Sequence, residues 1–281
     1  MVTLHDLAQA CGCSITSVSR AIKDSNTISR ALRAKVNQKA IELGYIPNGN
    51  AKSMRTGRAN TIAVIMQDTM NPYYSIVART VERYAAELKY NVIIFTTDYH
   101  TERELGAVYE ALKKQVDGVL LFPLQVDSKS LDVLDSSGRP YVLVGRSFED
   151  RAIDCVMPDD RQGVYLTTRH LLEKGHKRIL MINSFKHISS TRLREEGFRA
   201  AMTEAKCLVR DGDVHYISTD KGVCARLVED IFSREHDYTA VCCYNDLLAY
   251  EAYYHLRVMG YSIPDDIALT GVDALHSYLT F

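Results

Sequence analysis

The segment from Ser14 to Arg20 carries side chains that suit the reading of a nucleic acid. Arginine pairs with guanine, small hydroxyl groups bond to phosphates or base edges, and an aliphatic side chain contacts the thymine methyl group. Ser14 is a good N-cap for a short helix, and the exposed side chains of that helix would be Ile15, Thr16, Ser17, Ser19 and Arg20. We therefore expect a recognition helix for the major groove of double-stranded DNA.

The flanking residues predict two helices that would support this segment. Leu4, Leu7, Ala8 and Cys11 share one helical face because they stand at i, i+3, i+4 and i+7. Thr3 and Asp6 form a capping-box pattern before that face, and Gly12 can end the helix. A third helix is expected between Ser29 and Gly44, and its apolar positions include Val36, Ala40, Ile41 and Leu43.

The charge of the chain is unevenly distributed. Residues 1–60 contain nine basic and three acidic residues, a net charge of +6, whereas the remaining residues have a net charge of −7. A basic head on an acidic body suits a module that binds a polyanion. An ordinary basic surface is the alternative, but the helix-turn-helix pattern favours DNA.

Four motifs stand in the first 48 residues: TLxDLA from residue 3, CGCS from residue 11, VSR from residue 18 and ELGYxPN from residue 42. Together they resemble the head of the LacI/GalR family of bacterial transcription regulators, and their spacing matches that head without gaps through residue 58. The resemblance implies a hinge over residues 47–59 that folds on the operator, where Met54 would replace the leucine wedge of the family. Lys23 stands where the family often has asparagine. With the recognition helix, the expected DNA contacts are Thr3, Ser14, Ile15, Thr16, Ser17, Ser19, Arg20, Thr27, Asn48, Ala51, Lys52, Met54 and Arg55.

Alternating strand and helix patterns begin at Thr61. Short apolar runs such as residues 61–66 predict buried parallel strands, and repeated strand–helix units predict doubly wound sheets. The expected organisation is a helix-turn-helix domain at 1–46, the hinge at 47–59, and two Rossmann-like lobes at 60–155 and 156–281. The lobes also resemble the family's effector domain, which is of the type I periplasmic-binding-protein kind, with the last elements missing.

Polar and aromatic side chains follow the predicted strands, where open α/β sheets bind ligands. The motifs NPYY from residue 71, RxxGF from residue 194, ND from residue 245 and the acid after GV at 271–272 resemble family signatures. A guanidinium can hold adjacent hydroxyls or a carboxylate, and tyrosine can stack on a ring. The expected ligand-binding residues are Asp68, Tyr73, Tyr74, Arg194, Asn245, Asp246 and Asp273.

Each of these ligand residues also has a structural interpretation. One tyrosine of the pair at 73–74 can be a core residue, Arg194 can be a surface residue at a helix start, and Asp246 can be a helix N-cap. Gly145 stands where the family commonly has aspartate, and Ala274 where it has a second acid. The chain stops before the family's final elements, so we expect both lobes to be incomplete and the dimer to be weakened.

The sequence lacks the common motifs of several enzyme classes. The sequence contains no P-loop, no GxGxxG, no HExxH and no GxSxG, so an enzyme is disfavoured and neither a metal nor a cofactor is expected. No signal peptide or long apolar run is present, and the scattered cysteines suit a reducing bacterial cytoplasm. The predicted function is an effector-modulated transcription regulator of the repressor type that binds operator DNA as a homodimer. Its effector would be a sugar, a nucleoside or a related molecule. A sensor with an inactive DNA-binding head and an enzyme on the same scaffold are the alternatives.

Overall fold

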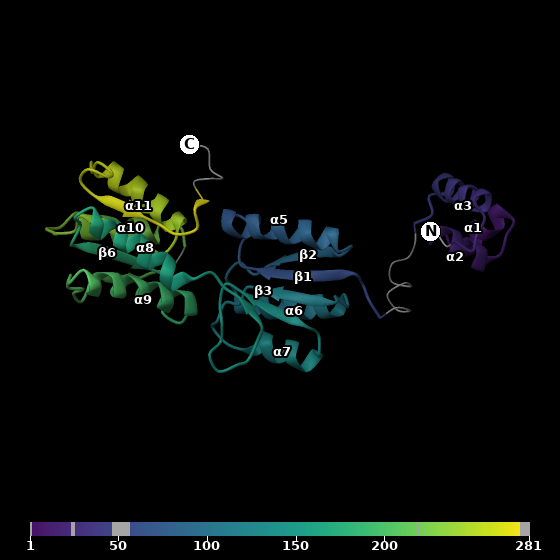
Figure 1. The fold of residues 1–281 in the computed structure, drawn as a ribbon, viewed down its shortest axis with the longest axis horizontal. Helices are drawn as coiled ribbons and strands as arrows, with labels where there is room; N and C mark the ends of the chain where they lie inside the picture. Colours follow the sequence, from purple (N-terminus) through teal and green to yellow (C-terminus); the bar gives the residue numbers. More distant parts are fainter. Residues whose placement is uncertain (1, 24–25, 47–56, 219, 276–281) are drawn as a thin grey trace. The chain divides into compact units, whose positions relative to one another are not determined.

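The computed structural model describes residues 2–23, 26–46, 57–218 and 220–275 of the chain. The chain divides into two compact units, residues 1–59 and residues 60–281 (Figure 1). The first unit contains α1 (Leu4–Cys11), α2 (Ile15–Ile22) and α3 (Arg30–Leu43). The second unit contains two parallel sheets, each covered by helices on both faces.

The caps predicted for the first unit are confirmed. Thr3 and Asp6 form a reciprocal capping box, Gly12 ends α1 at a φ of 64°, and Ser14 caps α2. The core of the three helices is made by Leu7, Ala8, Cys11, Val18, Ala21, Val36 and Ala40. Ile41 does not join this core and is 83% exposed, because five helical residues after Val36 it faces away from the packed side of α3.

The first sheet of the second unit has the strand order β2-β1-β3-β4-β5, and every pair is parallel. Its strands are β1 (Thr61–Met66), β2 (Asn91–Thr96), β3 (Gly118–Leu121), β4 (Tyr141–Val144) and β5 (Cys155–Val156). Its helices are α5 (Pro72–Glu87), α6 (Thr101–Lys113) and α7 (Lys129–Ser137). We call this sheet with its helices lobe 1.

Alternating residues of β1 explain why lobe 1 has two helical layers. Ala63 and Ile65 pack with α6 and α7, whereas Val64 and Met66 pack with α5 on the opposite face. Residues 62–66 of the strand are all apolar because both of its faces are buried. Strand β5 was not predicted from the sequence, since it has only two residues and both are exposed.

The second sheet has the order β7-β6-β8-β9, and it is also parallel. Its strands are β6 (Ile179–Asn183), β7 (Val214–Tyr216), β8 (Ala240–Cys243) and β9 (Ala268–Thr270). Its helices are α8 (Asp160–Glu173), α9 (Ser189–Glu204), α10 (Val223–Phe232) and α11 (Asp246–Val258). Helices α8 and α9 cover one face, and α10 and α11 cover the other, which makes lobe 2 (Figure 1).

Candidate functional site

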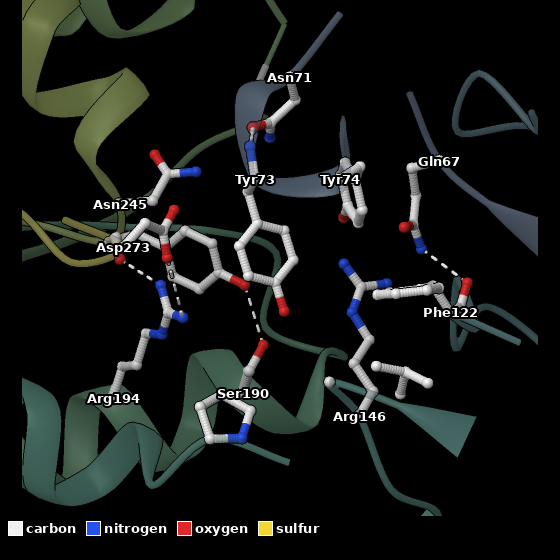
Figure 2. A pocket seen from close by; sticks show the side chains of 14 residues that line it. Gln67, Asn71, Tyr73, Tyr74, Phe122, Arg146, Ser190, Arg194, Asn245 and Asp273 are labelled. Carbon is white, nitrogen blue, oxygen red and sulfur yellow. Dashed lines mark hydrogen bonds and ion pairs between the residues drawn. The ribbon is translucent and has the colours of Figure 1, made fainter. Parts of the chain in front are cut away.

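A pocket lies between the two lobes, at the carboxyl ends of their strands (Figure 2). Lobe 1 contributes residues after β1, β3 and β4 and the first turn of α5, and lobe 2 contributes the start of α9 and the loops after β8 and β9. The lining residues are Gln67, Asn71, Tyr73, Tyr74, Phe122, Val144, Gly145, Arg146, Pro158, Ser190, Arg194, Tyr244, Asn245 and Asp273. Open parallel sheets place ligand sites at this edge because the loops there are free to vary.

Arg194 is the most heavily engaged side chain of the pocket. Its Nε donates to Asp160 Oδ1 at 2.7 Å, and its Nη1 donates to the carbonyl of Tyr244. Its guanidinium carbon lies 4.1 Å from the centre of the Tyr244 ring, a cation–π distance. Nη2 is 4.0 Å from Asp273 Oδ1 (Figure 2). The guanidinium is therefore flanked by two carboxyl groups, and that of Asp160 is bonded to it directly.

The interpretation of Arg194 as a surface residue at a helix start is wrong. Helix α9 begins at Ser189, so Arg194 lies in its second turn, and it is only 7% exposed. The polar residues 189–191 concealed the helix start, because the cap residue Ile188 makes no side-chain capping bond. Asp160, the buried partner of Arg194, was not predicted from the sequence.

Burial changes the ionisation of the acids around Arg194. Burial raises the pKa of Asp273 to about 7, although Arg194 opposes the shift, and Asp246 and Asp160 add to it. Burial also raises the pKa of Asp160 against the attraction of Arg194. An acid that titrates near neutrality inside a pocket is a candidate for ligand binding.

The lobe 1 side of the pocket is aromatic. Tyr74 is 8% exposed and packs edge-to-face on Phe122, with ring centres 5.5 Å apart. Tyr73 packs edge-to-face on Tyr74 and is half-buried. Both tyrosines line the pocket, so Tyr74 is a core residue and a wall residue at once.

Two further lobe 1 side chains are held by backbone carbonyls. Arg146 Nη1 donates to Pro123 O at 2.6 Å, and Gln67 Nε2 donates to Phe122 O at 2.8 Å. Gln67 is 1% exposed, and its Oε1 has no hydrogen-bond partner in the described structure. A buried acceptor without a partner is costly, so Gln67 Oε1 is a ready acceptor for a ligand hydroxyl. Neither Gln67 nor Phe122 was predicted as a site residue.

The backbone conformation at residue 145 explains why this chain has glycine where the family commonly has aspartate. Its φ is +77°, a conformation that side chains with a Cβ rarely adopt. A Cβ there would lie 3.8 Å from the Tyr73 hydroxyl. An aspartate at this position would be strained in this backbone.

Lobe 2 adds two residues that sequence reasoning missed. Ser190 Oγ and the Tyr244 hydroxyl lie 2.9 Å apart, which fixes the ring that Arg194 stacks on. Ser190 lies in the first turn of α9, and Tyr244 directly follows β8. The strand-end position of Tyr244 was a usable signal, since the adjacent Asn245 was selected on that ground.

Two of the predicted ligand residues do not line this pocket. Asp68 Oδ1 accepts from Met70 N at 2.7 Å, and Asp68 lines a larger outer cavity of about 570 Å³ between the lobes. Asp246 Oδ2 accepts from Leu275 N at 2.7 Å. The alternative of Asp246 as a helix cap is also wrong, because Asn245 caps α11 through its bond from Leu248 N at 3.0 Å.

Helix α2, the predicted recognition helix, presents a mixed outer face. Val18 and Ala21 are buried, whereas Ile15 is 47% exposed, and Thr16 and Arg20 are exposed as well. The hydroxyls of Ser14 and Ser17 lie 2.9 Å apart, and Ser14 Oγ also accepts from Ser17 N, so these serines stabilise the helix start.

The remaining predicted DNA contacts divide into two groups. Ser19 is half-buried and Thr27 is exposed, while the Thr3 hydroxyl takes part in the capping box. The predicted hinge contacts Asn48, Ala51, Lys52, Met54 and Arg55 lie outside the described residues.

Within the described ranges, no cluster of three or more metal-ligating side chains occurs. Among the same residues, no helix is long and apolar enough to cross a membrane.

Comparison with known proteins identifies the class. Residues 3–48 match the model of bacterial regulatory proteins of the lacI family, and residues 59–280 match the periplasmic binding proteins and sugar binding domain of the LacI family. The chain belongs to the LacI family. It is a helix-turn-helix, DNA-binding transcriptional regulator, and its relatives are regulators rather than enzymes.

Individual relatives agree with this assignment. The transcriptional regulator DegA of Bacillus subtilis (strain 168) is 31% identical over 279 residues, which cover 96% of this chain and 81% of DegA. GalR of Escherichia coli (strain K12) is 30% identical over 277 residues, which cover 97% of this chain and 80% of GalR.

Solved structures share the fold. The regulator CelR in complex with cellobiose has a TM-score of 0.71 and 27% identity, over 98% of this chain and 83% of that one. The Lac repressor dimer bound to operator has a TM-score of 0.84 over 97% of this chain and 82% of that one, and its 22% identity supports the fold alone.

Proposed function

We propose that this protein is a repressor whose operator affinity is set by a small, neutral polyhydroxy effector in the interlobe pocket. The observation that carries the proposal is the Arg194 guanidinium beside the carboxyl groups of Asp160 and Asp273, together with the unpartnered acceptor Gln67 Oε1 on lobe 1. The head supplies the DNA contact through the exposed residues of α2. A ligand that prefers one lobe arrangement would shift the population of DNA-competent molecules.

The charges of the pocket favour a neutral effector over a phosphorylated one. Arg194 is engaged by Asp160 and Tyr244 O, and Arg146 by carbonyls of the segment after β3. Arg194 also lies beside the carboxyl groups of Asp160 and Asp273, which disfavour an anionic ligand at that guanidinium. Asp273 and Gln67 Oε1 are acceptors, and hydroxyl groups are the donors that would complement them.

The aromatic walls and the comparison with CelR support a sugar or a nucleoside. Tyr73 and Tyr244 offer ring faces and edges to a flat or cyclic ligand. CelR was solved with a disaccharide, cellobiose, in a chain of the same fold. The outer cavity of about 570 Å³ adjoins the pocket and offers room for a second ring.

We propose further that the protein acts as a homodimer. Leu247, Tyr254 and Val258 stand at i, i+7 and i+11 of α11, and all three are exposed. An apolar stripe of this kind is typical of an interface. Two copies would place two α2 helices in successive major grooves of a pseudo-palindromic site.

Replacing Arg20 by alanine is expected to weaken binding to the preferred operator by about 1–3 kcal/mol and to relax the base preference at one position. Arg20 is exposed on α2, the helix from which we expect a contact to guanine. A gel shift against a palindromic operator library, followed by salt titration, measures both effects. An equal loss on random DNA would make Arg20 a phosphate contact instead.

The same library separates the repressor from the alternative of a sensor with an inactive head. A repressor selects a palindrome with a steep salt dependence. A chain that selects no sequence at low salt, while still binding a sugar or a nucleoside, contradicts the proposal. An enzyme on this scaffold would instead convert the ligand, which product analysis detects.

Asp273 is expected to make the second unit less stable as the pH rises. Its pKa in the folded protein is about 7, above the ordinary value of an aspartate, so the folded state binds a proton that the unfolded state has already lost. The contribution of protonated Asp273 to the free energy of unfolding is therefore fully present below about pH 4. It falls as the pH rises through 7, by on the order of 1 kcal/mol per pH unit.

Thermal unfolding at pH 5.5 and pH 8 tests this, with wild type compared against the Asp273→Asn variant. The variant should melt closer to wild type at pH 5.5 and higher than wild type at pH 8. Asp68→Asn is the matched control, since Asp68 lies outside the Arg194 pocket. A wild-type minus Asp273→Asn difference that is constant with pH would contradict an elevated pKa.

A further inference from the structure

Three residues close a ring of hydrogen bonds between the lobes. Gln125 follows β3 and Ser147 follows β4, both in lobe 1, whereas Ser189 is the first residue of α9 in lobe 2. Gln125 Oε1 accepts from Ser189 N at 2.9 Å and from Ser189 Oγ at 3.0 Å. Gln125 Nε2 donates to Ser147 O at 2.7 Å, and Ser147 N donates to Ser189 Oγ at 3.2 Å. We call this set the Gln125 clasp.

The clasp supplies the helix cap that the sequence at the start of α9 lacks. The N-cap residue of α9 is Ile188, which makes no side-chain capping bond. Unpaired N–H groups at a helix start need an acceptor, and Gln125 of the other lobe provides it. Ser189 is 8% exposed, so water cannot freely replace these bonds.

The helix capped in this way carries part of the pocket. Ser190 and Arg194 follow Ser189 by one and five residues on α9, and both line the pocket. A rotation of lobe 2 that breaks the clasp would therefore move the Arg194 guanidinium relative to Tyr73 and Arg146 on lobe 1.

Another lobe-to-lobe contact lies nearby but is weaker. Arg192 of α9 forms an ion pair with Glu149, which follows β4. The side chains are 51% and 73% exposed, and pairs of that kind contribute little to stability. The clasp is part-buried and joins the lobes through several hydrogen bonds, so it is the contact with the geometry to hold them.

We propose that Gln125 is a positioning residue that holds the lobes in this arrangement and aims α9, and with it Arg194, at the pocket. One carboxamide, that of Gln125, joins Ser147 of lobe 1 to Ser189 of lobe 2. The bonds of the clasp therefore break together when the lobes rotate. Its role in signalling rests on the proposed effector site, but its role in holding the lobes does not.

Interlobe distances test the clasp in the full chain without effector or DNA. Spin labels on a p-acetylphenylalanine at Tyr109 of α6 and at His170 of α8 avoid the native cysteines, and dilution with unlabelled protein removes signals between copies. Gln125→Asn tolerates the φ of 61° at this position and shortens the side chain by one methylene, so it cannot reach both serines. We expect its distance distribution to broaden or shift, while the melting temperature stays within a few degrees of wild type. An unchanged distribution would overturn the proposal.

Hydrogen exchange of residues 185–195 gives a second, independent reading. Gln125→Asn should speed exchange at the start of α9 by about tenfold, the factor for one lost bond of about 1.4 kcal/mol. Gln125→Glu keeps the acceptor for Ser189 N but loses the donor to Ser147 O. Because the lost bond lies within lobe 1, this variant should keep α9 protected and leave the interlobe distances close to those of wild type. Gln162→Ala, at an exposed glutamine of α8, is the matched control.

The variants distinguish failure of the clasp from failure of the proposed function. If Gln125→Asn matches Gln162→Ala in exchange and in distance, the clasp does not hold the lobes. If the two variants differ as expected but the protein selects no operator, the clasp stands and the repressor proposal fails.

Discussion

Arg194→Ala is expected to lower the free energy of unfolding of the second unit by about 3–5 kcal/mol, as well as to abolish any effector response. Asp160, whose side chain is 1% exposed, would lose the cation that it is bonded to. Its Oδ2 already has no hydrogen-bond partner in the described structure. Asp273 would lose the same cation from 4.0 Å. Urea denaturation followed by circular dichroism measures the change.

This expectation affects how a loss of response is interpreted. A single substitution that unfolds lobe 2 removes the response without revealing a ligand contact. The double variant Arg194→Met with Asp160→Leu removes both buried charges, and buried ion pairs replaced by apolar residues of similar size often retain stability. It should recover most of the lost stability and still fail to respond. A double variant that is stable and fully responsive would remove Arg194 from the ligand site.

Gly197→Ala is expected to destabilise lobe 2 by about 3 kcal/mol or more, because it overpacks a helix contact that cannot yield. A Cβ at Gly197 would lie 2.1 Å from the carbonyl oxygen of Arg161 and 3.0 Å from the amide nitrogen of Tyr165. Both atoms are backbone of α8, so no side chain can turn away. Helices α8 and α9 would have to separate, and the Asp160–Arg194 bond joins these same two helices.

Gly163→Ala is the matched control for this prediction. Gly163 lies inside α8, and a Cβ there meets nothing within 4 Å. Alanine in a helix interior is favoured over glycine by about 0.8–1 kcal/mol, so this variant should be slightly more stable than wild type. Equal melting temperatures for the two alanine variants would show that α8 and α9 pack less closely than described.

In the first unit, the features that depend on residues close in sequence were predicted correctly. The capping box of Thr3 and Asp6, the left-handed Gly12 and the Ser14 cap were all predicted, because each involves residues at most a few positions apart. The exposed Ile41 was not, since only the packing of three helices decides which side of α3 is inside.

Local sequence patterns predicted only some of the residues that line the pocket. The strand-end rule selected Tyr73 and Asp273 and the family signature selected Arg194, and the structure brings all three to one pocket. The rule also selected Asp68 and Asp246, which instead bond to nearby backbone amides. One position along a strand end changes the direction of a side chain, and that direction depends on neighbours distant in the chain.

The sequence by itself determined the class of protein, the helix-turn-helix head, the parallel α/β lobes and the edge at which the pocket would lie. Local periodicity, caps and motif spacing carry that information, because they act over a few residues. Only the tertiary structure decided that Arg194 is buried against Asp160, 34 residues earlier, and that Gln125 caps a helix starting 64 residues later. Such partners are chosen by the packing of whole lobes, which no local pattern encodes.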